Sequence, residues 1–241
     1  MAALTLSIRE VSGAFRAFRV AVALLRGLEQ GERASAGIAA FVSAAEADAL
    51  ALLADRAPAD LPEIQAWRAA YRAFGSKKTS YRNSCEALLR RLGQEGKLPR
   101  VLPLVDLYNA LSVKYRIPVG ADDLAKLVPS LAFRPARPGD SFFDLASEPP
   151  RDDPPPPGEI VYADAEKCLC RRWNWRQDAR SRVTAETRDA VVVLQTLEAD
   201  GAERLSAAAE DLAREAAAHL GASCRWAIAS AEMPEVGLEL D

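Results

Sequence analysis

Apolar positions recur at helical spacing through most of the first half of the chain and alternate near its start and middle. Leu107 and Leu111 lie four residues apart, as on one side of a helix. Val20, Val22 and Leu24 alternate instead, as on one face of a strand. We expect helices over 35–56, 61–74, 83–92, 103–116 and 202–220, and strands over 18–28, 160–164, 168–175, 190–197 and 225–228. A helix over 18–28 stays open, because alanine and leucine are good helix formers. Helices then dominate the first half and strands the middle, which favours an α+β class over an alternating α/β fold.

Residues typical of helix ends lie at the borders of these segments. Pro62 suits a first helical turn, and Gly75 suits the end of the same helix. Asn83 suits an N-cap, and Glu86 follows it three residues on, as in a capping box. Because the four prolines within 152–158 favour an extended form, this segment should be a stiff surface connection.

The composition is that of a soluble globular protein: of 241 residues, 49% are hydrophobic and 27% are charged. These values exclude a chain dominated by disorder and a fibrous chain. The length permits one large domain or two small ones, and a separate N-terminal lobe over 1–75 stays open.

Charge is unevenly distributed along the chain. The net charge is −3 and the isoelectric point is about 5.5, which argues against a general nucleic-acid binder. Residues 68–100 nevertheless hold nine Lys or Arg against two Glu, and residues 167–188 hold seven against one Asp and one Glu. Two basic segments on an acidic body would steer a polyanion to one face if they meet in space; otherwise they are two solvated surfaces.

The first ten residues lack the basic-then-apolar order of a signal peptide, and we find no apolar stretch of the about 18 to 20 residues that span a bilayer. We therefore expect a cytoplasmic protein without a membrane partner. The cysteines, Cys85, Cys168, Cys170 and Cys224, lack CxxC spacing, so reduced and buried thiols are expected. The single histidine, His219, lies far along the chain from Cys168 and Cys170. That distance disfavours a zinc site, and catalysis through a Ser-His-Asp or Cys-His arrangement would depend on the same residue.

The run from Arg171 to Gln177 (RRWNWRQ) gathers two of the four tryptophans, three arginines and two side-chain amides. Aromatic faces can stack on a planar group, guanidinium groups can hold a phosphate or carboxylate, and amides can bind polar edges. The run therefore suits ligand recognition. The alternative is a half-buried strand that packs Trp173 and Trp175 on the core and turns Arg172, Asn174 and Arg176 to water.

Several separated motifs fall in the order and spacing of one family. They are residues 100–123 (RVLPLVDLYNALSVKYRIPVGADD), 134–140 (RPARPGD), 159–164 and 170–187, together with Ser80-Tyr81-Arg82 and the RWNWR run. In these the chain resembles the tRNA-editing module of bacterial phenylalanyl-tRNA synthetase, which comprises the third and fourth domains of the enzyme's beta subunit. It is more similar still to the stand-alone members of that family. The resemblance is strongest over 80–197, about half of the chain.

The resemblance implies an α+β fold built around a β-sandwich and a single editing-type domain over 1–241. In the synthetase the module hydrolyses the ester between tRNA and a wrongly attached amino acid, chiefly tyrosine. The chain is then expected to be a trans-editing aminoacyl-tRNA hydrolase whose partner is aminoacylated tRNA and not DNA. A non-catalytic module that binds or senses tRNA or an amino acid is the alternative, and a hydrolase of an unrelated small ester or amide is a third interpretation.

The resemblance also assigns residues to the substrate pocket. Asp106 and Asn109 match the family's Val-Asp and the asparagine that lines the editing pocket. Arg134 and Asp140 match an Arg-x-Ala-x-x-Gly-Glu segment, with aspartate in place of glutamate. Asn174 takes the place of a pocket glycine. The residues expected to bind substrate are Trp173, Trp175, Arg176 and Gln177 on the same loop, together with Tyr81, Arg82, Arg171 and Thr187.

One departure from the family concerns specificity. The synthetase's pocket glutamate, which selects the tyrosine hydroxyl, falls at about Val193. An apolar side chain gives a phenolic hydroxyl no partner, and a site that bonds a hydroxyl discriminates far better than one that only fits it. We therefore do not transfer tyrosine specificity, and a smaller polar or acidic aminoacyl group suits Asn174 and Arg176 better.

Hydrolysis of an aminoacyl ester needs little more than a positioned water and donors aimed at the developing oxyanion. We expect Asn109 and Asn174 to orient substrate or water. Arg134 or Arg176 would hold a phosphate or stabilise negative charge, and Asp106 would position one of these donors. In the structural alternatives Asp106 braces a loop and Arg134 pairs with a nearby aspartate. The sequence has no carboxylate cluster for magnesium and no glycine-rich phosphate loop, so no metal or cofactor is expected.

Overall fold

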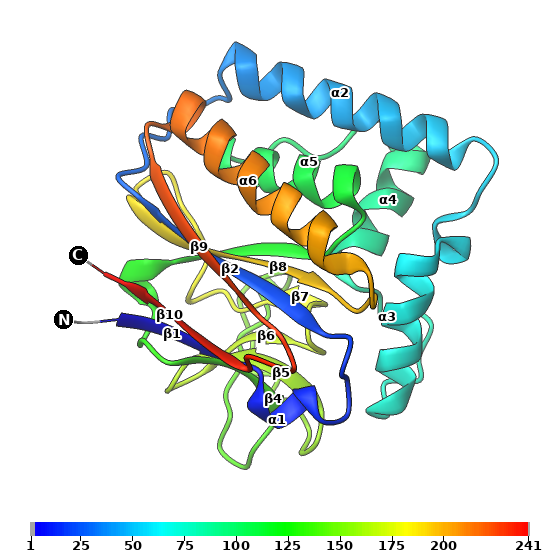
Figure 1. Ribbon diagram of the computed structural model, residues 1–241, viewed down its shortest axis with the longest axis vertical. Helices are drawn as coiled ribbons and strands as arrows, with labels where there is room; N and C mark the ends of the chain where they lie inside the picture. Colours follow the sequence, from blue (N-terminus) through cyan, green and yellow to red (C-terminus); the bar gives the residue numbers. More distant parts are fainter. Residues whose placement is uncertain (1–2, 241) are drawn as a thin grey trace.

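The computed structural model describes residues 3–240 and arranges them in three layers (Figure 1). Most of the helices form one outer layer, a four-stranded sheet lies in the middle, and a six-stranded sheet forms the other outer layer. The helices are α1 (Arg9–Ser12), α2 (Ala36–Leu53), α3 (Pro62–Ala73), α4 (Ser84–Glu95), α5 (Pro103–Tyr115) and α6 (Gly201–Leu220), with 3-10 turns at Pro58–Asp60 and Leu124–Lys126. The strands are β1 (Ala3–Ser7), β2 (Arg19–Arg26), β3 (Val119–Asp123), β4 (Leu131–Pro135), β5 (Ile160–Ala163), β6 (Cys168–Arg171), β7 (Arg176–Gln177), β8 (Asp189–Thr196), β9 (Ser223–Ala229) and β10 (Glu235–Glu239). The expected α+β class with a β-sandwich is confirmed.

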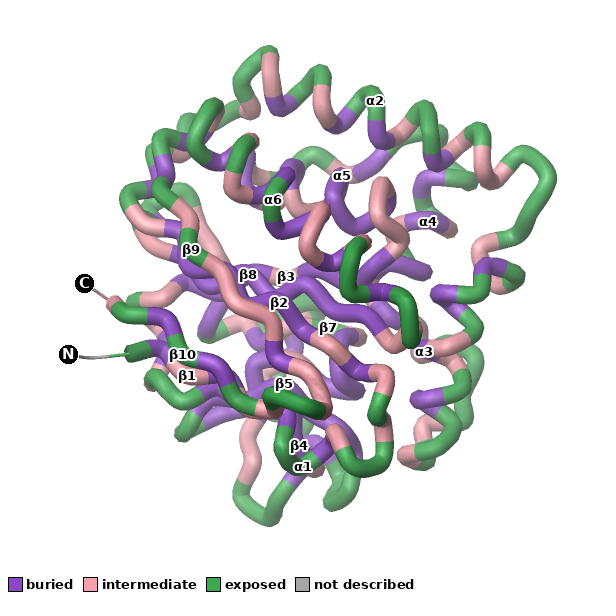
Figure 2. Tube along the Cα trace, in the orientation of Figure 1, coloured by how far each residue is buried: buried purple, intermediate pink, exposed green. Residues whose placement is uncertain are grey.

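The middle sheet is antiparallel, in the order β3-β8-β2-β9, and its central strands are buried on both faces (Figure 2). Along β2, Ala21 and Ala23 belong to the apolar cluster formed with α2, α4, α5 and α6. Val20 and Val22, which alternate with them, belong to the cluster formed with the six-stranded sheet. Because both faces are covered, the strand is a near-continuous apolar run rather than a polar-apolar alternation.

The outer sheet has the order β10-β1-β4-β5-β6-β7. Its pairs are antiparallel except β1 with β4, which run parallel. The first 75 positions, for which the sequence left a separate lobe open, supply strands to both sheets, because β1 lies in the outer sheet and β2 in the middle one. The strands that were not expected from the sequence are β1, β3, β4, β7 and β10.

The five expected helices are present, with ends that differ by a few residues. Pro62 is the first residue of α3, and Gly75, with φ of 90°, follows its end. The Asn83 side chain accepts a hydrogen bond of 2.9 Å from the backbone N–H of Glu86, as an N-cap does. The capping box is only half formed, because the Glu86 carboxylate accepts from Nε of Arg68 at 3.0 Å.

The expected strand over 168–175 is wrong beyond Arg171, where β6 ends. Arg172 and Trp173 adopt left-handed backbone conformations, with φ of 46° and 67°. Two such residues reverse the chain instead of continuing a strand. The alternation of side chains between two faces is lost here, so Trp173 and Asn174 are both buried.

By length and composition, α2 could cross a membrane. This differs from our expectation, which was that no stretch of the chain is long and apolar enough to do so. This is weak support for a membrane span, because helices in the core of a soluble protein can have the same length and composition. In the structure Ile38, Val42, Ala45 and Ala49 form a buried stripe that packs in the helical layer. Glu46, in the same helix, accepts a hydrogen bond of 2.7 Å from the backbone N–H of Leu98.

Candidate functional site

A cavity of about 280 Å³ opens where all three layers meet. Its walls come from α4 and α5, from β3 and β8 of the middle sheet, and from β5, β6 and the loop between β6 and β7. Apolar and aromatic side chains form most of the wall. The polar side chains that line it include Asn109, Asp122, Asn174, Gln177 and Gln195. A mostly apolar hollow with a few convergent polar groups is typical of a small-molecule site.

The aromatic and arginine run supplies one wall of this cavity. Its residues from Trp173 to Gln177 all line it. Trp173 is fully buried and makes edge-on contacts with the rings of Phe18 and Trp67, at centroid distances of 4.8 and 5.4 Å. Trp173 therefore packs the core, as the core interpretation predicted, and it also lines the cavity. That it binds a ligand stays a prediction.

The Asn174 amide is fixed by two hydrogen bonds. Its Oδ1 accepts from the Tyr71 hydroxyl at 2.9 Å, and its Nδ2 donates to Oε1 of Gln195 at 3.1 Å. In addition, the backbone N–H of Ser84, the first residue of α4, donates to the Asn174 carbonyl at 2.9 Å. α3 and β8 thus hold the side chain of Asn174 in place, and α4 holds its backbone. Gln195 was not among the site residues expected from the sequence.

Asp122 is the second functional residue that the sequence interpretation missed. It lies on β3, is 3% exposed and lines the cavity. Its Oδ1 accepts hydrogen bonds from Nε2 of Gln177 at 2.9 Å and from Oγ of Ser181 at 2.7 Å. Burial raises the pKa of Asp122 to about 7, although these two hydrogen bonds oppose the increase. A carboxyl group with that pKa can accept or donate a proton near neutral pH.

Several polar atoms of the cavity residues have no partner within residues 3–240. The Asn109 side chain, 7% exposed, makes no hydrogen bond there. The Tyr162 hydroxyl and the Trp173 indole N–H are buried and also unpartnered. Buried donors are normally paired in folded proteins, so these groups stand out among the residues of the cavity wall, and the Asn109 amide is the one that a ligand in the cavity can reach.

A stack of aromatic rings and guanidinium groups borders the cavity. The Arg172 guanidinium lies over the rings of Tyr81 and Trp175, with its Cζ 3.8 and 4.3 Å from their centroids. The Arg176 guanidinium also lies over Trp175, at 4.5 Å, and Arg176 forms an ion pair with Asp144. Such contacts fix the Trp175 ring at the cavity wall.

Two of the expected arginines lie in buried ion pairs outside the cavity. Arg134 donates to both carboxylate oxygens of Asp140, at 2.7 and 2.8 Å. Although burial opposes ionisation, the hydrogen bonds from Arg134 lower the pKa of Asp140. Arg171 donates to both carboxylate oxygens of Glu159, at 2.9 and 3.1 Å. Neither arginine lines the cavity. Arg134 therefore fits the structural alternative, in which it pairs with an aspartate, and Arg171 likewise holds a buried carboxylate.

Asp106 and Thr187 also lie away from the cavity wall. Asp106 accepts a hydrogen bond of 2.8 Å from the backbone N–H of Val101, which braces the loop before α5. Burial raises its pKa. Thr187 donates from its hydroxyl to Oδ2 of Asp123 at 2.8 Å. Asp106 and Asn109 lie three residues apart on α5, and of these two only Asn109 reaches the cavity.

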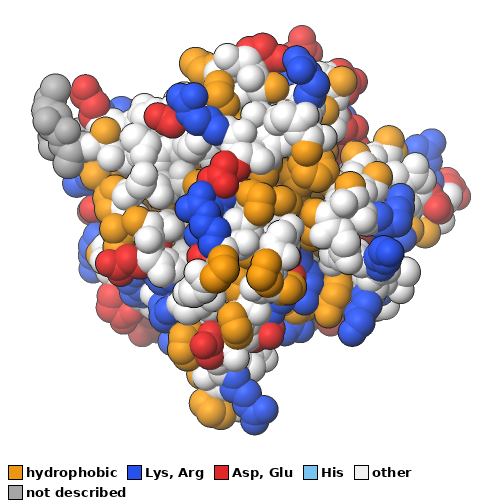
Figure 3. All heavy atoms as spheres, turned by 90° about the horizontal axis from the view of Figure 1, so that it is seen from below, with side chains coloured by type: hydrophobic (Ala, Val, Ile, Leu, Met, Phe, Trp, Pro, Cys, Tyr) orange, Lys and Arg blue, Asp and Glu red, His pale blue; other side chains and the backbone are white. Residues whose placement is uncertain are grey.

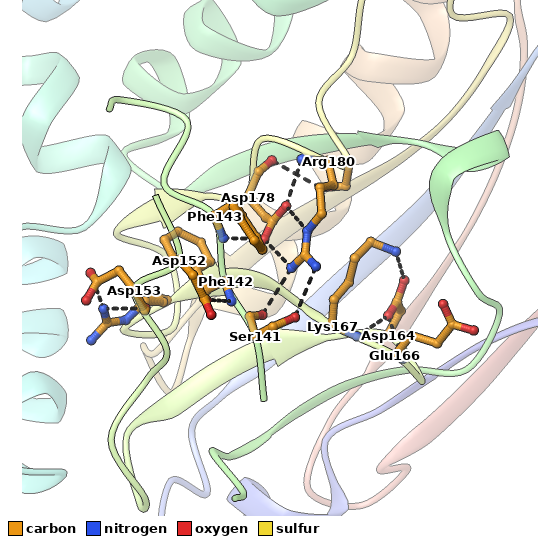
Figure 4. Close-up of polar contacts among 12 residues, drawn as sticks. Ser141, Phe142, Phe143, Asp152, Asp153, Asp164, Glu166, Lys167, Asp178 and Arg180 are labelled. Atoms are coloured by element: carbon orange, nitrogen blue, oxygen red, sulfur yellow. Dashed lines mark hydrogen bonds and ion pairs between the residues drawn. The ribbon is translucent and has the colours of Figure 1, made fainter. Parts of the chain in front are cut away.

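The segment after Gln177 is held by ionic contacts that are shown in Figure 4. Asp178 is fully buried and accepts from the backbone N–H of Phe143 at 2.8 Å. Arg180 donates to both oxygens of Asp178, at 2.9 and 2.7 Å, and to Oγ of Ser141 at 3.0 Å. This cluster ties β7 to the long segment between β4 and β5, and thereby positions Gln177.

The two basic segments meet at the contact between Tyr81 and Arg172, but ion pairs neutralise much of their charge. Arg68 and Arg82 both pair with Glu86. Arg82 does not line the cavity. Figure 3 shows acidic and basic side chains interspersed over one face of the molecule. No broad basic face of the kind that binds duplex nucleic acid is visible there.

Two packed sheets, a helical layer on one side and a cavity where the layers meet define an α+β domain of the sandwich type. The chain belongs to the B3/4 domain family, which matches residues 66–216, more than half of its length. The phenylalanyl-tRNA synthetase beta-like domain that the motifs indicated is thereby confirmed, and the chain is related to that synthetase subunit.

The fold is similar to that of a crystal structure of an N-terminal fragment of the phenylalanyl-tRNA synthetase beta-subunit from Pyrococcus horikoshii. The TM-score is 0.51 at 12% sequence identity, and the similarity covers 91% of this chain and 50% of that chain. This chain therefore spans about half the length of that fragment. No curated protein matches the chain.

Proposed function

We propose that this protein hydrolyses the ester between a wrongly attached amino acid and tRNA, with the aminoacyl group bound in the cavity. The observation that carries the proposal is the buried carboxyl group of Asp122, which lines the same cavity as the amides of Asn109 and Asn174. Membership of a family related to a tRNA synthetase subunit supports tRNA as the carrier of the ester.

In the reaction, ionised Asp122 takes a proton from a water molecule as the water oxygen bonds to the ester carbonyl carbon. The bond between that carbon and the ribose oxygen then breaks, and the ribose oxygen receives the proton. Donors placed around the carbonyl oxygen stabilise the negative charge that develops on it. The unpartnered amide N–H of Asn109 is the candidate for this role.

The polar groups of the cavity wall favour a polar aminoacyl group. The volume of about 280 Å³ is larger than a single amino-acid side chain, so size alone does not select among aminoacyl groups. Val193, 3% exposed, supplies an apolar patch, whereas Gln177 and Gln195 supply amides. A polar side chain would gain hydrogen bonds from these amides, and a phenolic hydroxyl at Val193 would gain none.

The test is to incubate the purified protein with a panel of correctly and wrongly charged tRNAs and to follow loss of the aminoacyl ester. We expect rapid loss from a subset, and a rate lowered at least about tenfold by Asn109→Ala, because the substitution removes an orienting amide. Gln94→Ala, which removes an exposed amide from α4, is the matched control and should act like the wild type.

Two outcomes would contradict the proposal. The first is the absence of ester loss from every member of the panel while the protein stays folded. Saturable binding of tRNA or an amino acid without turnover would then support the non-catalytic alternative. The second is full activity of Asn109→Ala, which would place the reaction outside this cavity.

A further inference from the structure

A second hollow, of about 360 Å³, lies beside the cavity and shares a wall with it. The loop between α3 and α4 lines one side of the hollow, and the proline segment before β5 lines another. Arg172 and Tyr81 line the hollow, whereas Trp175 lines the cavity. The stack of these three side chains therefore separates the two spaces.

Arg172 brings a cationic group with one unsatisfied nitrogen to this hollow. The residue is 8% exposed, and its Nη1 is buried with no hydrogen-bond partner among residues 3–240. Its nearest carboxylate is Glu159, at 3.5 Å from Nε. A buried N–H of a charged group without an acceptor is unfavourable, so an oxyanion that enters the hollow would gain a strong hydrogen bond there.

The charge of the hollow is positive despite the presence of Glu159. That carboxylate already accepts from Nε and Nη2 of Arg171 and from the backbone N–H of Arg172. Lys77 and Lys78 are exposed, and within residues 3–240 neither lies at ion-pair distance from a carboxylate. The hollow thus holds three cationic side chains and one carboxylate that Arg171 neutralises.

Ser76 adds a neutral donor at the same place. Its hydroxyl is buried and has no hydrogen-bond partner in the described part of the chain. A guanidinium group, two ammonium groups and a hydroxyl around a hollow of this size match the three terminal oxygens and the charge of a phosphate group.

We infer that this hollow binds a phosphate group, and that in the cell the phosphate belongs to the single-stranded end of an RNA whose terminal ester lies in the neighbouring cavity. The identity of the RNA rests on the proposed function, whereas phosphate binding itself does not. The shared wall then separates two parts of the bound RNA. The phosphate lies on the side of Arg172, and the aminoacyl group lies on the side of Trp175.

Fluorescence anisotropy with a labelled short single-stranded RNA tests the inference, with inorganic phosphate as competitor. We expect Lys77→Ala/Lys78→Ala to weaken RNA binding about tenfold and to reduce its dependence on salt, because each lysine contact releases counterions. Arg172→Gln should weaken binding further, and Arg172→Lys should restore part of it, since it keeps the charge but loses the planar fork.

The control variant is Arg56→Ala/Lys97→Ala, which removes the same charge from exposed positions outside the hollow. Equal loss of binding in this control would overturn the inference, as would wild-type affinity in the Lys77→Ala/Lys78→Ala variant. Tight binding of inorganic phosphate together with no RNA binding would assign the hollow to free phosphate and overturn the RNA part. RNA binding through the hollow without any ester hydrolysis would instead refute the proposed function, and it would leave the inference that the hollow binds RNA phosphate intact.

Discussion

Tyr71 on α3 and Asn174 in the cavity wall are joined by a hydrogen bond of 2.9 Å from the tyrosine hydroxyl to Oδ1 of the amide. Both residues are 4% exposed. The same amide donates to Gln195 on β8. The Tyr71 hydroxyl therefore helps to set the orientation of the Asn174 amide. A helix that contributes no residue to the cavity surface therefore controls one of its polar groups.

The first prediction concerns this contact. Tyr71→Phe leaves the Asn174 oxygen buried without its donor, which should lower the free energy of unfolding by about 1 to 3 kcal/mol. Ester hydrolysis should also slow, because the amide gains rotational freedom. Denaturant unfolding and single-turnover deacylation measure the two effects. Tyr115→Phe, which removes a hydroxyl bonded to Asp211 between α5 and α6, should lose stability only. Equal activity of the two variants would show that the Tyr71 hydroxyl does not serve the site.

The second prediction concerns stability and pH. The pKa of Asp122 is about 7 in the folded protein and about 4 in an unfolded chain. The folded state therefore binds the proton more tightly, so the contribution of Asp122 to stability is greatest below about pH 4 and falls as pH rises toward about 7. Within that window the slope should approach about 1.4 kcal/mol per pH unit. Asp122→Asn should flatten this part of the profile, whereas Asp48→Asn, at an exposed position of α2, should not. Parallel profiles for wild type and Asp122→Asn would contradict the assignment.

The third prediction separates a structural arginine from a catalytic one. The side chains of Arg134 and Asp140 are 9% and 10% exposed. Arg134→Leu leaves a buried carboxylate unpaired, which should destabilise the protein by about 3 to 5 kcal/mol. Arg134→Leu/Asp140→Leu should regain most of that stability. Among molecules that remain folded, the deacylation rate should be that of the wild type. A folded double variant without activity would restore the role in charge stabilisation that the sequence suggested.

The fourth prediction concerns the start of α4. Asn83 is 2% exposed and caps the helix that brings Ser84, Ala87 and Leu88 to the cavity. Asn83→Ala should lower stability by about 1 kcal/mol, because the cap is lost. Asn83→Asp keeps a hydrogen-bond acceptor at the cap and should retain most of the wild-type stability. Thermal unfolding of the two variants compares them directly, and equal loss in both would mean that the cap hydrogen bond is not the cause.

The helices were predicted well because the spacing of their apolar residues and their capping residues both lie within short stretches of the sequence. Pro62 and Asn83 lie at helix starts, as expected. The strands that escaped prediction are short or poor in β-forming residues: β3 reads VGADD and β10 reads EVGLE. Such strands form because neighbours offer backbone partners, and a single sequence does not show those neighbours.

The site was predicted less completely than the fold. Asn109 and the residues from Trp173 to Gln177 line one cavity, as the motifs suggested. Asp122 was missed because its neighbours, Gln177 and Ser181, are more than fifty positions away in the chain. Its one local signal was a pair of adjacent carboxylates in an otherwise apolar and small stretch. The left-handed conformations at Arg172 and Trp173 were missed because neither residue type favours them.

The most direct test is the pH dependence of single-turnover deacylation by the wild type and by Asp122→Asn, on a charged tRNA that the panel identifies. If Asp122 is the general base, the wild-type rate rises with pH and levels off above about 7, where the carboxylate is ionised. The Asp122→Asn rate should be lower by about 10² to 10⁴ and lack that inflection. A folded Asp122→Asn protein with the wild-type rate and profile would contradict the account.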